Sequence, residues 1–164
     1  MPINFEDVEA IKILRSRYFR AMDMGDYDTY RSLLTEDLIT DLKGANYHFQ
    51  YNNREDFIEA VSSALNADMA CRHLGHHPEI TITSPNTAEG VWYLQDWAAN
   101  VRTREVMEGT AIIRDRYRKV DGQWKIYHYE YRRVVEMVST LPESVQITAH
   151  YLGEHGRKPA ERQS

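Results

Sequence analysis

Apolar residues recur with a helical period through the first part of the chain. Between Asn4 and Gly25 they return every three or four positions, which is typical of a helix with one buried face. Asn4 is a suitable N-cap for this helix, and Gly25 is a suitable stop. The predicted buried positions are Phe5, Val8, Ile11, Leu14, Tyr18 and Met22.

Two shorter helices are predicted after the first one, with a strand between them. Asp26 can cap a helix over residues 27–35. Residues 53–68 repeat the helical period, with a buried stripe that is formed by Phe57, Ile58, Val61 and Leu65. The segment DLITDLKG, residues 37–44, instead favours a strand that ends in a turn.

From residue 70 onward the pattern indicates extended structure. Residues 72–84, 88–101, 106–120 and 123–138 form runs of strand character, and aromatic residues are frequent in the second and fourth. Asp121-Gly122 separates the last two runs, and such a pair between alternating runs is a strong signal for a β-hairpin. The order of elements predicts an α+β domain, in which three N-terminal helices pack on one face of a curved antiparallel sheet. We expect such a sheet to enclose a pocket.

The length of 164 residues fits one domain. We expect this domain to cover residues 1–141 and the polar residues 142–164 to form a tail, disordered over 155–164. The net charge of −5 argues against a nucleic-acid partner. The N-terminus does not resemble a signal peptide, and we expect no membrane span. Cys71 is the only cysteine, so an internal disulfide is excluded and a cytoplasmic location is expected.

The most distinctive polar motif is HLGHH, residues 73–77. His73 is the best candidate for a general base, because an imidazole titrates near neutral pH and Gly75 leaves space beside it. The alternative is a structural histidine that bonds to a backbone group. All three histidines would share one face only on a helix, which Gly75 and Pro78 disfavour, whereas on a strand His76 faces away from His73 and His77. We therefore expect no metal site.

Asp23 is a second candidate, at the predicted end of the first helix between two methionines. A carboxylate in apolar surroundings requires a partner, and a histidine is a natural one. The alternative is a helix-terminal residue that faces water. Tyr18 precedes Asp23 by five residues, roughly 140° around a regular helix, so the two would share a pocket only across a π-bulge. Otherwise Tyr18 belongs to the core.

Asp96 lies in an aromatic strand segment, where aspartate is uncommon. It shares a strand face with Trp92, so it is either an acid/base group of the pocket or the partner of an arginine such as Arg114 or Arg116. His128 alternates with the apolar residues of its own strand and is a further candidate for the pocket wall.

Four segments together resemble a known family: EAIKILRSRYFRAMDMGDYDTYRSLLTEDLIT, HLGHHPEITI, GVWYLQDW and DGQWKIYHYEYRR. They are similar to the SnoaL-like branch of the nuclear transport factor 2-like superfamily, over residues 5–140. Within that branch the chain resembles bile-acid 7α-dehydratase most and, more distantly, scytalone dehydratase and hexachlorocyclohexane dehydrochlorinase. The resemblance implies a cone-shaped α+β barrel, and a His/Asp pair that eliminates water or HCl from a cyclic substrate without a metal.

The resemblance also implies roles for particular residues. The family's catalytic positions match Tyr18 and Asp23 in YFRAMD, His73 in HLGH and Asp96 in WYLQD. A further pocket tyrosine is replaced by Leu42, and either Tyr47 or Tyr51 could fill its space. The implied activity is that of a cofactor-independent lyase acting on an apolar ring such as a steroid or polyketide, in a homodimer or homotrimer. An isomerase or cyclase with the same pair, a binding module and a dioxygenase small subunit are the alternatives.

Overall fold

The computed structural model describes residues 4–159. Its helices are α1 (Phe5–Asp23), α2 (Tyr27–Ser32), α3 (Arg54–Ala64) and α4 (Tyr151–His155). Its strands are β1 (Leu34–Lys43), β2 (His48–Tyr51), β3 (Met69–Ser84), β4 (Thr87–Asn100), β5 (Glu105–Val120) and β6 (Gln123–Thr140). The strands form one sheet in the order β2-β1-β6-β5-β4-β3.

Local signals define the predicted helices. The side chain of Asn4 accepts a hydrogen bond from the backbone N–H of Asp7, and Asp26 caps α2 by accepting from Thr29. The apolar stripe of α1 is buried from Ile11 onward, as predicted. The two stripe positions before Ile11 differ from the prediction, because they lie at the helix start: Phe5 is 72% exposed and Val8 is half-buried.

The sheet contains the predicted hairpin and one pairing that differs from the prediction. Asp121 and Gly122 both have positive φ angles, as the tight turn between β5 and β6 requires. All neighbouring strands are antiparallel except β1 and β6, which run parallel. The predicted antiparallel sheet is therefore confirmed, with this one parallel pair within it. The intervening chain from β2 to β5 forms a long crossover, which a parallel pair needs.

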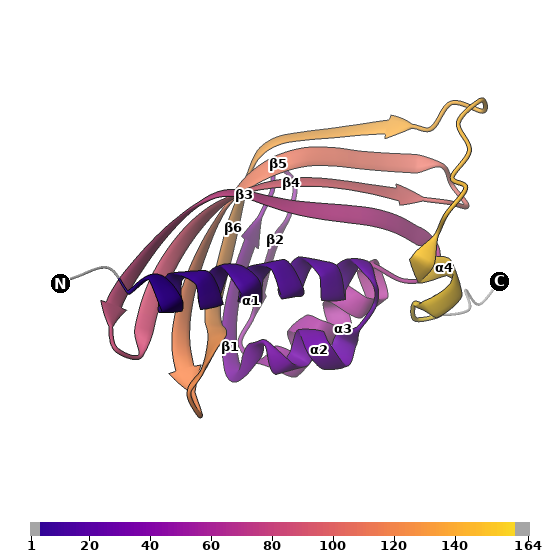
Figure 1. Ribbon diagram of the computed structural model, residues 1–164. Helices are drawn as coiled ribbons and strands as arrows, with labels where there is room; N and C mark the ends of the chain where they lie inside the picture. Colours follow the sequence, from indigo (N-terminus) through magenta and orange to yellow (C-terminus); the bar gives the residue numbers. More distant parts are fainter. Residues whose placement is uncertain (1–3, 160–164) are drawn as a thin grey trace.

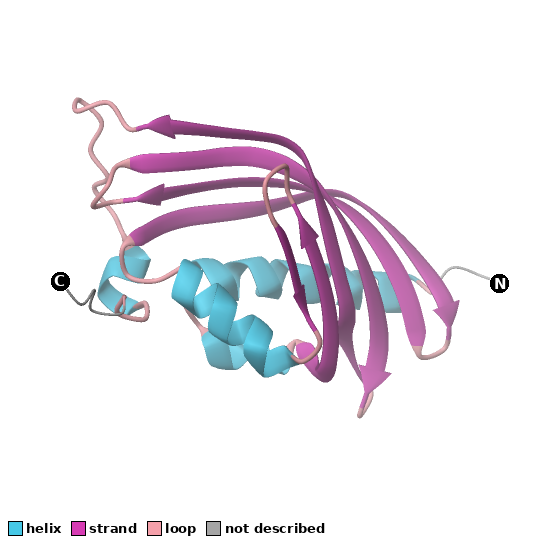
Figure 2. Cartoon of the chain, turned by 180° about the vertical axis from the view of Figure 1, so that it is seen from behind, coloured by secondary structure: helices cyan, strands magenta, loops and turns pink. Residues whose placement is uncertain are grey.

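The sheet curves over the helices to form the cone-shaped α+β architecture. In Figure 1, α1 lies under the concave side of the sheet. Helices α2 and α3 lie below the C-terminal half of α1. Figure 2 shows from behind that β1 and β2 bend down beside α3, so the sheet and helices wrap around one core. Among residues 4–159, none of the helices combines the length and apolarity needed to cross a membrane.

The C-terminal segment is partly helical and contacts the domain. Leu152 of α4 is buried, and His150 bonds to the backbone carbonyl of Met69 on β3. The backbone N–H of Ala67 donates to the carbonyl of Arg157. Residues 142–159 therefore pack on the domain that precedes them. Residues 160–164 lie outside the described part, so the disorder expected there stays a prediction.

Candidate active site

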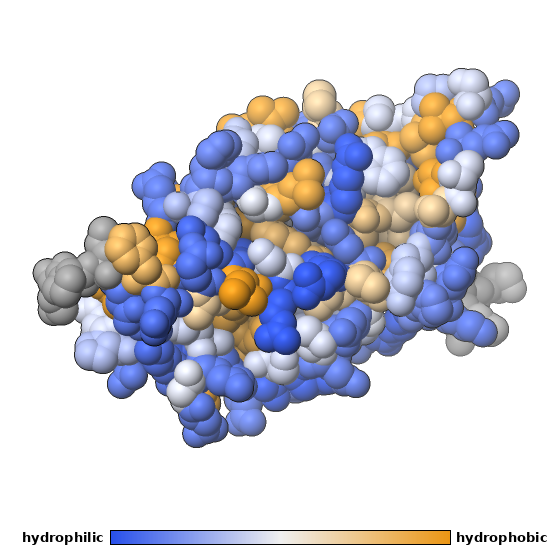
Figure 3. Space-filling model, viewed as in Figure 1, coloured by the Kyte–Doolittle hydropathy of each residue, from blue (hydrophilic) through white to orange (hydrophobic). Residues whose placement is uncertain are grey.

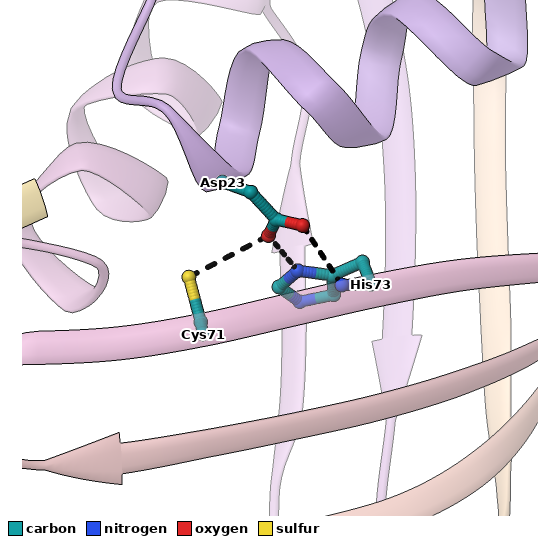
Figure 4. Close-up of side chains that lie close together, drawn as sticks. All are labelled: Asp23, Cys71 and His73. Atoms are coloured by element: carbon teal, nitrogen blue, oxygen red, sulfur yellow. Dashed lines mark hydrogen bonds and ion pairs between the residues drawn. The ribbon is translucent and has the colours of Figure 1, made fainter. Parts of the chain in front are cut away.

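Asp23 and His73 meet where the end of α1 lies against β3. Oδ1 of Asp23 is 2.6 Å from Nδ1 of His73, and Oδ2 accepts the backbone N–H of His73 at 2.9 Å. Figure 4 shows the carboxylate above β3, with the imidazole turned toward it. The His73 side chain is 11% exposed. A carboxylate at Nδ1 favours the tautomer with the proton on Nδ1, which leaves the lone pair on Nε2.

Cys71 completes a small cluster around Asp23. Its thiol donates to Oδ1 of Asp23 over 3.5 Å. Burial raises the pKa of the thiol far above its ordinary value, and the neighbouring carboxylate raises it further. The ligand atoms of Asp23, Cys71 and His73 lie within 4.8 Å of one another. They could hold a soft divalent cation only if the thiol lost its proton, and the expected absence of a metal stays a prediction.

A cavity of about 400 Å³ opens beside this pair, between α1, β3 and β4. It is lined by Arg15, Ser16, Phe19, Arg20, Asp23, Met24, His73, Leu74, Gly75, His76 and Trp92. Figure 3 shows apolar side chains between α1 and the sheet on a face that is otherwise mostly hydrophilic. His76 also lines this cavity, although strand alternation predicted that it faces away from His73.

Phe19 fills the space that Gly75 leaves. Its ring is parallel to the His73 ring, with 6.3 Å between their centroids. A Cβ atom at position 75 would lie 2.6 Å from Cε2 of Phe19. The glycine is therefore required for the close approach of an aromatic ring, and in this structure that ring occupies the space expected for a ligand.

Tyr18 lies in the core, away from the lining of this cavity. It is 1% exposed and accepts a hydrogen bond of 2.7 Å from the hydroxyl of Tyr30. Because α1 is a regular α-helix through Asp23, residues 18 and 23 point in different directions. The structure thus places Tyr18 in the core, as the residue spacing predicted for a helix without a π-bulge, and the catalytic role that the resemblance implied for it stays a prediction.

Asp96 is held in a buried ion pair with Arg133. The two carboxylate oxygens lie 2.6 and 2.7 Å from the guanidinium nitrogens. The partner comes from β6, and not from Arg114 or Arg116, whose side chains lie on the outer face of β5. Tyr47 accepts from Nε of the same arginine at 3.2 Å. Asp96 and Tyr47 therefore belong to a second polar cluster, separate from the lining of the cavity.

The other residues predicted to line the pocket lie in three different places in the structure. Trp92 lines the cavity, as expected. His128 lies on the opposite face of the sheet, in a separate pocket of about 220 Å³ that Arg116 also lines. The register of β6 shifts at Tyr127, and this bulge reverses the alternation from which His128 was placed inside. Leu42 packs against the hydrophobic core from β1.

Comparison with known families and structures supports the sequence resemblance. Residues 4–130 match the SnoaL-like domain. The chain belongs to the SnoaL-like family. The match covers most of the chain and includes Asp23, His73 and Arg15.

Solved structures share the fold of this SnoaL-like protein. A proposed scytalone dehydratase of Novosphingobium aromaticivorans has a TM-score of 0.73 and 19% identity, over 98% of this chain and 97% of that one. The dehydrochlorinase LinA-type3 of Novosphingobium barchaimii has a TM-score of 0.73 and 16% identity, over 88% and 96%. A proposed aromatic ring hydroxylase of Novosphingobium aromaticivorans has a TM-score of 0.74 and 20% identity, over 85% and 96%. At these identities the likeness shows the fold alone.

Sequence reasoning missed Arg15 of this SnoaL-like protein. Its side chain is 0% exposed and donates from Nη2 to Oδ1 of Asp115 at 3.3 Å. Asp115 also accepts the hydroxyl of Tyr117 at 2.6 Å, and Tyr117 accepts from the indole of Trp92 at 2.9 Å. Its position in the sequence could have indicated that Arg15 is buried, because Arg15 follows Ile11 by four residues and so lies on the apolar stripe of α1.

Proposed function

We propose that this SnoaL-like protein is a cofactor-independent lyase that eliminates water from an apolar cyclic substrate, such as a steroid or a polyketide-like ring. The observation that carries the proposal is the 2.6 Å contact between Asp23 and Nδ1 of His73 beside a cavity. The sequence resemblance to bile-acid 7α-dehydratase supports the steroid class as a substrate. The family membership supports a His/Asp mechanism in general.

The geometry suits His73 as a general base. With its Nδ1 proton directed to Asp23, the imidazole offers Nε2 to a C–H bond that a conjugated carbonyl acidifies. The electron pair of that bond moves toward the carbonyl, and Asp23 stabilises the imidazolium that forms. The C–O bond then breaks, a C=C bond forms, and the proton on Nε2 joins the departing hydroxide as water. We assign no step to Tyr18 or Asp96, because neither lines this cavity and the Asp96 carboxylate is paired with Arg133.

The test is elimination of water from panels of hydroxylated steroids and polyketides, followed by mass spectrometry. His73→Ala should lower the rate by about 10²–10⁴-fold, the usual contribution of a general base. Asp23→Asn should also lower it, because the imidazole tautomer is no longer held. His128→Ala is the matched control, since this histidine lies on the opposite face. Full activity of His73→Ala on an identified substrate would refute the assignment, and products of unchanged mass would indicate an isomerase.

We further propose that the protein acts in the cytoplasm, where its single cysteine, Cys71, stays reduced.

We also propose that the protein self-associates. Apolar side chains are exposed on β6 beyond its pairing with β1: Val134, Val135, Met137 and Val138. Such a strand end is typical of an interface. Sedimentation of the wild type and of Val138→Lys should give a larger and a smaller species, respectively. Equal masses for the two proteins would contradict this interface.

A further inference from the structure

Arg15 has donor groups that the fold leaves without an acceptor. Within residues 4–159, its Nε and Nη1 atoms are buried and have no hydrogen-bond partner. Only Nη2 is bonded, to Asp115. Buried N–H groups without an acceptor cost free energy, so each one requires an explanation.

Aromatic faces surround the guanidinium. Its carbon lies 4.3 Å from the ring centroid of Tyr18 and 4.9 Å from those of Phe19 and Tyr129. Ring faces stabilise a cation, but they do not replace an oxygen acceptor. An arginine keeps its charge when buried, so this part of the core holds a permanent cation with two free donor atoms.

Phe19 lies between this cation and the His/Asp pair. Arg15, Phe19 and Asp23 are spaced by four residues on α1, so they form one row along the helix. The same Phe19 ring contacts the guanidinium and is parallel to the His73 ring. All four residues line the one cavity of about 400 Å³. Rotation of the Phe19 side chain would open the cavity between the Arg15 guanidinium and the His73 imidazole, so that one ligand could reach both.

We propose that Arg15 is the binding site for an oxygen atom of the ligand, which Nε and Nη1 reach when Phe19 turns aside. The ligand class is a ring system of two or more fused rings that carries a carbonyl or phenolic oxygen. The row from Arg15 to Asp23 rises about 12 Å along the helix, which one six-membered ring does not span. This inference deepens the proposed function and rests on it for the use of the cavity. In the reaction, this oxygen receives the negative charge that forms when His73 removes the proton.

The test uses 2-naphthol, a two-ring phenol whose neutral and ionised forms have different absorption spectra. Bound to the wild type near neutral pH, it should show an ionised fraction at least tenfold above that of the free probe. Arg15→Gln combined with Asp115→Asn removes both buried charges and should abolish the effect. Arg118→Gln combined with Asp37→Asn is the matched control, because it also removes one positive and one negative charge, at an ion pair on the surface.

A second measurement needs no variant. Naphthalene has the same rings without the oxygen, and the wild type should bind it at least tenfold more weakly. Absence of saturable binding of 2-naphthol to the wild type would overturn the proposal. So would equal ionised fractions in the wild type and the double variant, or equal affinities for the two probes.

His73→Ala separates this inference from the proposed function. The variant should keep the increased ionisation of the bound probe and lose the elimination of water. Elimination of water by the wild type without increased ionisation would refute the role of Arg15 alone. Increased ionisation without any elimination would refute the lyase alone.

Discussion

The contribution of the buried ion pair between Arg15 and Asp115 to the stability of the fold can be tested directly. Both side chains are 0% exposed, and Asp115 is the only carboxylate that Arg15 contacts within the described residues. Asp115→Asn leaves the guanidinium charged and without a counter-ion in an aromatic environment. Breaking a buried pair in this way costs about 3–5 kcal/mol. That is a large part of the roughly 5–15 kcal/mol that stabilises a typical domain.

The assay is urea unfolding followed by tryptophan fluorescence. With a slope of about 2 kcal/mol/M, the loss lowers the midpoint by about 1.5–2.5 M. Adding Arg15→Gln to Asp115→Asn should recover part of the lost unfolding free energy, because the guanidinium charge without a counter-ion is then removed. The expected coupling free energy of the double-mutant cycle is about 1–3 kcal/mol.

Asp37→Asn is the control for this experiment. Asp37 pairs with Arg118 at the surface, where its side chain is 64% exposed, so its loss should cost less than about 1 kcal/mol. A cost below about 1 kcal/mol for Asp115→Asn, or a coupling free energy near zero, would refute the argument that Arg15 depends on this carboxylate.

Three further predictions concern other parts of the fold. Gly75→Ala places a Cβ against Phe19 and should cost about 1–3 kcal/mol; an unchanged melting temperature would contradict this. A hydrogen bond from Lys119 lowers the pKa of Asp7 in the folded protein. Asp7 therefore stabilises the fold at pH values above its pKa in the unfolded chain, about 4. This contribution is lost as the pH falls through the pKa of Asp7 in the folded protein. The difference in unfolding free energy between wild type and Asp7→Asn should therefore shrink on acidification, measured by urea unfolding. Leu152→Ala should cost about 2–5 kcal/mol in the same assay, and no change would mean that α4 folds apart from the domain.

The sequence alone determined the elements whose signals are local. The spacing of Ile11, Leu14 and Tyr18 predicts α1, because a helix places every third or fourth residue on one face. Asp121-Gly122 predicts its hairpin, because the turn needs positive φ at both positions. The family resemblance then identified Asp23 and His73 as a pair, and the structure places their side chains in contact.

Only the tertiary structure decided which distant residues meet. One bulge at Tyr127 moved His128 to the outer face, because strand alternation reverses wherever a residue is inserted. The partner of Asp96 is Arg133, because β5 lies between β4 and β6 and its Gly109, which pairs with Asp96, has no side chain to block the arginine from reaching across. Strand order and bulges depend on packing across the whole domain, and no short stretch of sequence encodes them. The same packing buried Arg15 against Asp115, a hundred residues away.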